Sequence, residues 1–230
     1  MSDYFITGTD TGVGKTWVTL ALMKTMQDKG KVVVGMKPVA SGCQKTSAGL
    51  RNDDAVRILE QSNQTLNYKT VNPYAFERAV APHIAAELMG TVIDIEKIAS
   101  EFSTLKKEAD SVVVEGIGGW CVPLSENIML ADVVKRLGLP VILVVGLRLG
   151  CINHALSTIR AIEADGVRLH GWITSQLDAD YACLNETMTT LQAHISAPLL
   201  GSLPHTEKFD LEILASHIMM TDCPGAKASI

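Results

Sequence analysis

The feature that most constrains this chain is the glycine-rich segment Gly8-Thr-Asp-Thr-Gly-Val-Gly14-Lys15-Thr16 near its N-terminus. The apolar run before it, residues 4–7, predicts a β-strand, and the apolar spacing of residues 15–29 predicts a helix that Gly30 closes. Between a strand and a helix, the backbone N–H groups of such a loop hold phosphate oxygens, together with the positive helix end. Lys15 would then neutralise the β- and γ-phosphates, and the Thr16 hydroxyl would ligate Mg²⁺. The loop predicts a nucleotide-binding protein of the P-loop class and leaves the nucleotide open.

The spacing Gly-x5-Gly-Lys-Thr is one residue longer than the usual Gly-x4-Gly-Lys-Thr. The alternative is a glycine-rich turn followed by a chance Lys-Thr pair. The strand and the helix on either side favour the phosphate loop over that alternative.

The rest of the chain alternates β-rich runs with helical stretches, which is typical of an α/β fold. Strands are predicted at residues 32–36, 111–114, 140–145, 171–174 and 198–201, and helices at 52–61, 93–109, 152–164, 181–193 and 209–218. Residues 38–50 are expected to form a loop, and residues 62–87 give no clear pattern. We predict a single P-loop domain over residues 1–230, a doubly wound and mainly parallel sheet with helices on both faces.

Composition limits the partners of the chain. The formal net charge is -5 with acids and bases interspersed, so no basic stripe indicates nucleic acid. The longest apolar run, residues 140–147, is too short to cross a membrane, and no signal peptide is evident, so we expect a cytoplasmic protein without a membrane partner. The five cysteines form no CxxC pair and the six histidines are dispersed, which argues against a zinc site.

Ligands of such a sheet bind at the carboxyl ends of its strands, where several polar residues are predicted to meet. Glu115 ends a buried strand and precedes a glycine-rich turn, which suits a carboxylate that contacts Mg²⁺. Lys37 ends another strand and is a candidate for stabilising an anion, although a surface lysine fits its position equally well. Spacing alone favours a solvated capping carboxylate for Asp54. Residues 150–153 open a further helix, whose N-terminus could hold a carboxylate.

Eight stretches in order along the chain resemble the dethiobiotin synthetase family. They are residues 5–16 (FITGTDTGVGKT), 35–42 (GMKPVASG), 49–55 (GLRNDDA), 71–74 (VNPY), 114–120 (VEGIGGW), 140–146 (PVILVVG), 150–155 (GCINHA) and 197–201 (APLLG). The long form of the phosphate loop is the family's own variation and is close to diagnostic.

The resemblance implies a ligase of biotin biosynthesis, which closes a ring on 7,8-diaminononanoate with CO₂ and MgATP. One amine captures CO₂ as a carbamate, the carbamate attacks the γ-phosphate to give a carbamic–phosphoric anhydride, and the second amine closes the ring. In this family the substrate carboxylate binds across a homodimer interface.

The resemblance also implies a role for each matching residue. Lys37 and Lys15 would be catalytic, and Thr16, Asp54 and Glu115 would hold Mg²⁺. ATP is assigned to Gly12, Val13, Gly14, Lys15, Thr16, Trp17, Asp54, Glu115, Gly116, Ile117, Gly118, Ser175, Gln176, Pro204, His205 and Thr206. The diamine is assigned to Thr11, Ser41, Gly150, Cys151, Ile152 and Asn153.

The chain departs from the family pattern at the base end of the nucleotide. The family commonly has an asparagine that reads adenine just after the strand at residues 171–174, where this chain has Ser175. A hydroxyl cannot make the paired contact of an amide. We expect either that base selectivity is relaxed, or that Gln176 or residues 204–206 recognise the base in place of the asparagine. Gly12 stands where relatives often have Glu, and residues 178–230 match least well.

Two other functions remain as alternatives. A partition-type P-loop ATPase would carry a signature lysine early in the loop, where this chain has Asp10. A nucleotide-binding regulatory subunit without catalysis would keep Lys15 and Thr16 but would not need Lys37, Ser41 or the helix start at residues 150–153.

Overall fold

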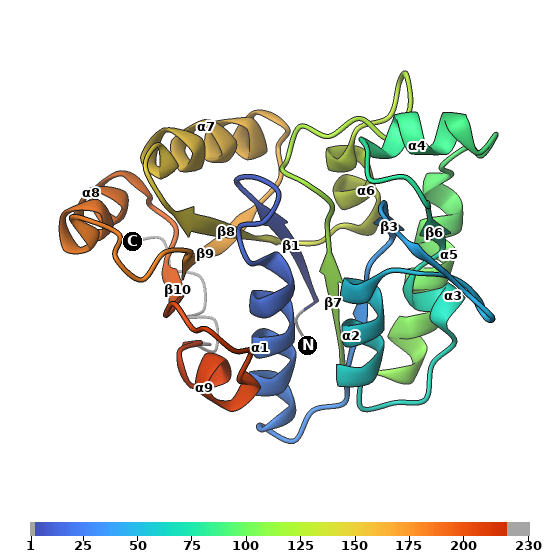
Figure 1. The fold of residues 1–230 in the computed structure, drawn as a ribbon, viewed down its shortest axis with the longest axis horizontal. Helices are drawn as coiled ribbons and strands as arrows, with labels where there is room; N and C mark the ends of the chain where they lie inside the picture. The colour runs from blue at the N-terminus through green and yellow to red at the C-terminus, as the bar shows by residue number, and fades with distance from the viewer. Residues whose placement is uncertain (1–2, 220–230) are drawn as a thin grey trace, which may run out of the picture.

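The computed structural model of the chain describes residues 3–219, which are built on a six-stranded parallel sheet. The strand order is β10-β9-β8-β1-β7-β2 (Figure 1). The strands are β1 (Tyr4–Gly8), β2 (Val33–Met36), β7 (Ser111–Glu115), β8 (Val141–Leu147), β9 (Leu169–Gln176) and β10 (Leu199–Leu203). Strands β1, β7 and β8 are buried along their whole length, as a parallel sheet covered on both faces requires.

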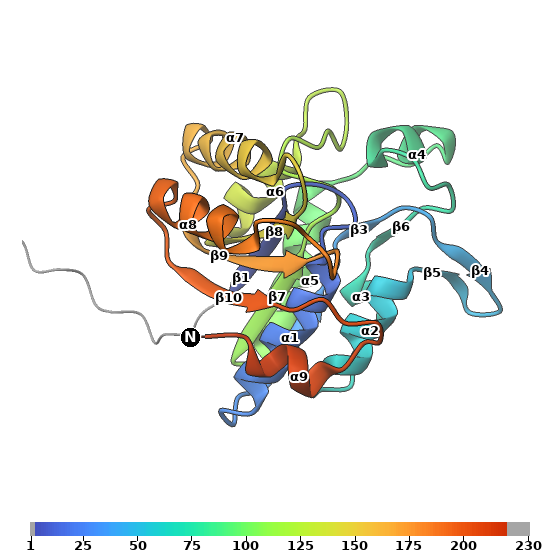
Figure 2. The same ribbon diagram turned by 60° about the vertical axis from the view of Figure 1, so that its left-hand side comes forward.

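Helices cover both faces of the sheet (Figures 1 and 2). On one face α1 (Lys15–Gln27), α2 (Asp53–Gln61) and α9 (Leu211–Ser216) pack on Ile6, Val113 and Ile142. On the other face α5 (Ile95–Glu108) and α6 (Leu130–Leu137) pack on Phe5 and Val114, while α7 (Cys151–Ala164) and α8 (Leu184–His194) pack beside them. The doubly wound α/β fold predicted from the sequence is confirmed.

The expectation of a plain loop at residues 38–50 is wrong. This segment contains β3 (Val39–Ala40), which pairs with β6 (Tyr74–Ala75), and an antiparallel hairpin of β4 (Gln44–Thr46) and β5 (Gly49–Arg51). Figure 2 shows the hairpin projecting from the body of the protein. The side chains of β4 are exposed, so no apolar alternation marks the strand. The Thr46 hydroxyl instead closes the turn by donating to the Gly49 carbonyl at 2.7 Å.

Strand β9 is longer than its apolar run predicts, and this changes the position of two site residues. The ladder with β8 continues through the pairs Gly146↔Ser175 and Leu147↔Gln176. Ser175 and Gln176 therefore end the strand, rather than starting the loop after it. Polar side chains hid this extension, although backbone pairing with a buried neighbour does not depend on side-chain polarity.

Three helices were not predicted: α3 (Tyr68–Val71), α4 (Pro82–Leu88) and α6. The first two are short, and α6 is marked mainly by its ends. The Asp132 carboxylate accepts from the Met129 N–H at 2.9 Å, and Gly138 closes the helix at a φ of 66°. Other predicted bounds differ by a few residues. The helix expected at 181–193 begins at Leu184, and the one expected at 209–218 spans Leu211–Ser216.

Some predictions fall outside the described residues. The single domain predicted for residues 1–230 includes residues 1–2 and 220–230, which lie outside them, as does Cys223. Within residues 3–219 no helix is both long and apolar enough to cross a lipid bilayer.

We predict that Leu22→Ala destabilises the protein by about 2–5 kcal/mol, because it opens a cavity between α1 and the sheet. Leu22 is fully buried in the core beside Ile6 and Val113. Leu149→Ala is the matched control, because Leu149 is 95% exposed and its truncation should change the free energy of unfolding by less than about 0.5 kcal/mol. Denaturant titration followed by circular dichroism measures both. Equal effects of the two substitutions would contradict the packing described here.

Candidate active site

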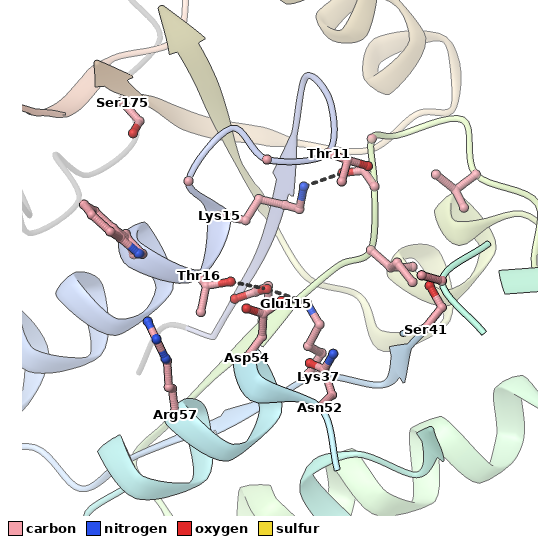
Figure 3. A pocket seen from close by; sticks show the side chains of 18 of the residues that line it. Thr11, Lys15, Thr16, Lys37, Ser41, Asn52, Asp54, Arg57, Glu115 and Ser175 are labelled. Carbon is pink, nitrogen blue, oxygen red and sulfur yellow. Dashed lines mark hydrogen bonds and ion pairs between the residues drawn. The ribbon is translucent and has the colours of Figure 1, made fainter. Parts of the chain in front are cut away.

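A pocket of about 900 Å³ opens at the carboxyl ends of β1, β2, β7 and β9 (Figure 3). Its location follows from the parallel sheet, whose strands all end at the same edge. The lining residues are Thr11, Gly12, Gly14, Lys15, Thr16, Trp17, Lys37, Ser41, Asn52, Asp54, Arg57, Ala79, Val80, Ala81, Pro82, Glu115, Ile117, Gly118, Gly119, Val122, Ser175, Gln176, Leu177, His205 and Thr206.

The phosphate loop enters α1 through a backbone conformation that favours glycine. Gly14 is the residue before the helix, with a φ of 90° and a ψ of 20°. A Cβ at this position would also lie 2.6 Å from the Ser175 hydroxyl oxygen, so the end of β9 packs directly on the loop. The first turn of α1 carries no acidic side chain. Its free N–H groups and the positive end of the helix dipole therefore suit an anion.

Lys15 crosses the pocket from the first position of α1. Its ammonium donates to the Asp10 carbonyl at 2.8 Å and to the Gly118 carbonyl at 2.6 Å. The side chain is mostly buried, and burial lowers its pKa to about 8, with the charge of Lys37 as the next contribution. Both partners are neutral carbonyls, so the ammonium of Lys15 forms no direct ion pair with a carboxylate and is available to bind an anionic ligand.

A buried charged cluster lies at the adjacent ends of β2 and β7. The Lys37 ammonium lies 2.5 Å from Glu115 Oε1 and 3.0 Å from Asp54 Oδ2. The Thr16 hydroxyl donates to the same Glu115 Oε1 at 3.0 Å. Glu115 is fully buried and Lys37 is 4% exposed. The register explains the main contact, because Met36 pairs with Val114 and the next residue on each strand is therefore Lys37 or Glu115.

The charges of this cluster stabilise one another. Burial alone would lower the pKa of Lys37, but Glu115 and Asp54 outweigh burial and raise it above its ordinary value. Burial also acts to raise the pKa of Asp54, but the charge of Lys37 outweighs it and holds that pKa below its usual value. Lys37 and Asp54 are therefore both charged at neutral pH.

The donor set of the cluster fits Mg²⁺. Glu115 Oε2 is buried and has no hydrogen-bond partner, so one carboxylate oxygen remains open for a ligand. Two carboxylates and a hydroxyl are the hard oxygen donors that Mg²⁺ uses, with phosphate and water oxygens completing its shell. Residues 3–219 contain no group of three or more His, Cys, Asp or Glu side chains that could hold a metal alone. The protein therefore offers a partial site of the kind that a nucleotide completes.

Lys37 is positioned by a polar chain that sequence reasoning missed. The Asn72 amide donates to the Lys37 carbonyl at 2.6 Å, and the Tyr68 hydroxyl donates to Asn72 Oδ1 at 3.0 Å. The same hydroxyl accepts from the Asn52 N–H at 2.8 Å, and the Asn52 side chain caps α2. This chain links the end of β2 to the start of the helix that carries Asp54. The available signal was an asparagine between the apolar neighbours Val71 and Pro73.

Asp10 of the phosphate loop is tied to Arg148, just before the start of α7. Asp10 accepts from the Thr11 N–H at 2.7 Å and pairs with the Arg148 guanidinium at 2.5 Å. The backbone hydrogen bond to Thr11 is the main cause that lowers the pKa of Asp10, with Arg148 contributing. Arg148 had no predicted role. It leads into Gly150, which caps α7 with a φ of 92°.

The pocket contains most of the predicted site residues, but not all of them. Val13, Gly116, Pro204, Gly150, Cys151, Ile152 and Asn153 do not line it. Val13 belongs to the core instead, and Cys151 is buried with its thiol 3.9 Å from the Tyr181 hydroxyl. The helix start at residues 150–153 is thus connected to the phosphate loop through Arg148, outside the walls of the pocket.

At the predicted base end, Gln176 is already engaged. Its amide donates to the Asp178 and Ala179 carbonyls at 3.0 and 3.2 Å, which holds the turn after β9. The Thr206 hydroxyl oxygen is buried, lines the pocket and has no partner. The pocket also contains side chains that sequence reasoning did not select, namely Asn52, Arg57, Ala79, Val80, Ala81, Pro82, Gly119, Val122 and Leu177.

Solved structures with a similar fold include ATPases. The MinD cell division protein of Aquifex aeolicus has a TM-score of 0.58 at 18% identity, covering 95% of this chain and 88% of that chain. A ParA family ATPase from Chlorobium tepidum TLS has a TM-score of 0.57 at 11% identity, covering 95% and 91%. At these identities the likeness establishes the fold alone.

Sequence relatives are much more similar. A family model described as an AAA domain matches residues 2–212. The ATP-dependent dethiobiotin synthetase BioD of Xylella fastidiosa (strain Temecula1) is 46% identical over 205 residues, covering 89% of this chain and 91% of the relative. The protein of the same name from Cellvibrio japonicus is 44% identical over 218 residues, covering 95% and 96%. With this identity over nearly the full length of both partners, the chain belongs to the ATP-dependent dethiobiotin synthetase family.

Proposed function

We propose that the protein is a dethiobiotin synthetase of biotin biosynthesis, a ligase that converts 7,8-diaminononanoate, CO₂ and ATP to dethiobiotin, ADP and phosphate. The observation that carries the proposal is the Lys37 cluster, which lies beside a phosphate loop and in the same pocket. Membership of the family named above supports the identity of the substrates.

In this reaction one substrate amine bonds to CO₂ and releases a proton, which gives a carbamate. A carbamate oxygen then bonds to the γ-phosphorus while the bond from that phosphorus to ADP breaks. The product is a carbamic–phosphoric anhydride. The second amine attacks its carbonyl carbon and loses a proton as the ring closes, while the bond from that carbon to the phosphate oxygen breaks and phosphate leaves. Phosphoryl transfer depends mainly on positioning and charge neutralisation, so it needs no covalent catalyst from the protein.

The residues of the pocket fit these steps. Lys15, held by two carbonyls, presents its charge to the β- and γ-phosphates. Lys37 lies on the Ser41 side of the pocket, where it would stabilise the carbamate and the transferring phosphoryl group (Figure 3). Thr16, Asp54 and Glu115 would hold Mg²⁺, which when bound neutralises charge on the phosphate oxygens. Thr11 and Ser41 would contact the diamine.

Further parts of the proposal rest on the family. The carboxylate of the diamine would bind at the helix start of residues 150–153, near the interface of a homodimer. The enzyme would act in the cytoplasm. Arg148 gives this assignment a physical connection, because it joins that helix start to Asp10 of the phosphate loop.

The two alternatives are less well supported. A partition-type ATPase would place a lysine where the Asp10 carboxylate pairs with Arg148. A regulatory subunit would have no use for a buried lysine between two carboxylates, because burying the charges of Lys37 and Glu115 costs free energy.

We expect phosphate release from ATP to require both 7,8-diaminononanoate and bicarbonate, because the phosphate acceptor is the carbamate that they form. A coupled phosphate assay on the purified protein, with each component omitted in turn, measures this. The same assay with a panel of nucleoside triphosphates tests the base preference. Phosphate release that is independent of the diamine would exclude the proposed function.

We predict that Lys37→Gln lowers turnover by about 100-fold or more, because it removes a charge that stabilises the transferring phosphoryl group. ATP binding, measured by calorimetry, should remain, since Lys15 and the phosphate loop are intact. Lys69→Gln, an exposed lysine on α3, is the control and should leave turnover unchanged. Retained turnover in the Lys37 variant would remove Lys37 from the mechanism.

We also predict that ATP affinity falls as pH rises from about 7.5 to 9.5, by up to about tenfold per unit. The pKa of Lys15 in the free protein is about 8, and a bound polyphosphate raises it. Its contribution to binding is therefore complete below about 8 and is lost at higher pH, where binding must take up a proton. Calorimetry in buffers of different ionisation enthalpy measures that uptake. A flat profile, without proton uptake, would contradict the assigned role of Lys15.

A further inference from the structure

Arg57 is a charged residue of the pocket that the mechanism above does not use. It lies on α2 three residues after Asp54, so the two side chains share one face of the helix. In Figure 3, Thr16 and Asp54 lie in the middle of the view. Arg57 lies on one side of them, and Lys37 and Ser41 lie on the other side. The pocket therefore has an acceptor side with Lys37 and a second side with Arg57.

An aromatic ring, rather than a carboxylate, lies beside the guanidinium of Arg57. Its Cζ lies 5.8 Å from the centre of the Phe209 ring, and that ring meets Trp17 edge-on at 5.6 Å. Among residues 3–219 no hydrogen bond or ion pair engages Arg57. Its N–H donors therefore remain available to a ligand, whereas Lys37 is already paired.

The charges that line the pocket explain why such a residue is needed. The ammonium groups of Lys15 and Lys37 are balanced by the carboxylates of Asp54 and Glu115. Arg57 is the remaining arginine or lysine in the lining, so it supplies the net positive charge of the pocket. A magnesium-bound triphosphate keeps a net negative charge, so the positive charge of Arg57 would attract it and strengthen its binding.

The position of Arg57 in the pocket indicates which part of a bound nucleotide would lie beside it. Figure 3 shows Ser175 far from Ser41. Trp17, Ser175 and Thr206 all line the pocket, and they are among the residues predicted to meet the nucleotide. Ser175 packs on Gly14 of the phosphate loop, so a nucleotide that reaches both Lys15 and Ser175 passes the first turn of α1. Trp17 belongs to that turn, and the ring of Phe209 connects it to Arg57.

We propose that Arg57 binds the phosphate chain of the nucleotide and is a further substrate-binding residue of this enzyme. Its planar guanidinium would donate to phosphate oxygens from the α2 side, while Lys15 binds them from the loop side. The ring of Phe209 orients the guanidinium before the ligand arrives. The proposal rests on the proposed use of ATP and adds a residue that the family motifs do not contain.

The test is nucleotide binding without the diamine. Arg57→Gln should raise the dissociation constant for ATP by about tenfold, and Arg57→Lys by less, since a point charge lacks the paired geometry. Inorganic tripolyphosphate has no base or ribose. Its dissociation constant should rise in Arg57→Gln by the same factor as that of ATP. Calorimetry measures the dissociation constants of both ligands for the wild-type protein and the two variants. Quenching of Trp17 gives a second readout, because Trp120 and Trp172 are buried in the core.

Arg160→Gln is the matched control, because Arg160 is an exposed arginine on α7 that does not line the pocket. It should leave both dissociation constants unchanged. Thermal melting checks that each variant is folded, and Arg57→Lys keeps the test usable if the Gln variant is not. Unchanged ATP binding in Arg57→Gln would overturn the proposal. Weaker binding of ATP with unchanged binding of tripolyphosphate would also overturn the proposal, since Arg57 would then contact the base or the ribose.

Steady-state kinetics separate this proposal from the proposed function. If both hold, Arg57→Gln raises the KM for ATP and leaves the KM for 7,8-diaminononanoate unchanged. If the wild-type protein does not turn over the diamine, the proposed function fails, but the binding experiment still decides the role of Arg57. A raised KM for the diamine alone would place Arg57 on the acceptor side and overturn the proposal.

Discussion

The ion pair between Lys37 and Glu115 is the interaction around which the site is organised. Two charges that are almost completely removed from water must be paired closely, and these lie 2.5 Å apart. The pairing requires β2 and β7 to be neighbours in one particular register, because the two residues follow the aligned pair Met36↔Val114. A slip of one residue would separate the charges and turn each strand's buried side chains to the opposite face.

Other parts of the site are arranged to maintain this pair. Asn72 fixes the carbonyl of Lys37, and Tyr68 connects Asn72 to the cap of α2, which presents Asp54. Thr16 contributes a hydroxyl from the first turn of α1. The phosphate loop, the edge strand β2 and the helix α2 are therefore coupled through polar contacts at one point. Double-mutant cycles are the appropriate way to apportion energy within such a network, because its members are not independent.

The pocket has two sides with different electrostatics. On the side with Lys37 its charge is balanced by carboxylates, which suits a reaction in which charge moves between groups. On the side with Lys15 and Arg57, neither cation has a carboxylate partner within residues 3–219, which suits a ligand that brings its own negative charge. The pKa of Lys15 is lowered in this arrangement, because burial and the charge of Lys37 together outweigh the opposing effect of the nearby carboxylates.

The sequence by itself determined the local features of this protein. Gly14, Lys15 and Thr16 are adjacent in the chain, so their motif could be recognised without a structure, and the apolar runs of β7 and β8 identified a buried parallel sheet. The same reasoning selected Glu115 from its place at a strand end, whereas it left Lys37 open between a site residue and a surface lysine until the family resemblance assigned it to the site. It could not establish that they touch, because strand order and register depend on contacts between distant parts of the chain.

Only the tertiary structure decided the features that depend on such contacts. The Asn72 link, the Asp10–Arg148 pair and the position of Arg57 beside Phe209 all join residues that are far apart in sequence. The β4–β5 hairpin and the polar end of β9 escaped prediction because backbone pairing forms them, while the apolar pattern reports only burial. Functional groups on adjacent residues can be recognised in the sequence. Contacts between groups on different strands and helices can be identified only once the fold is known.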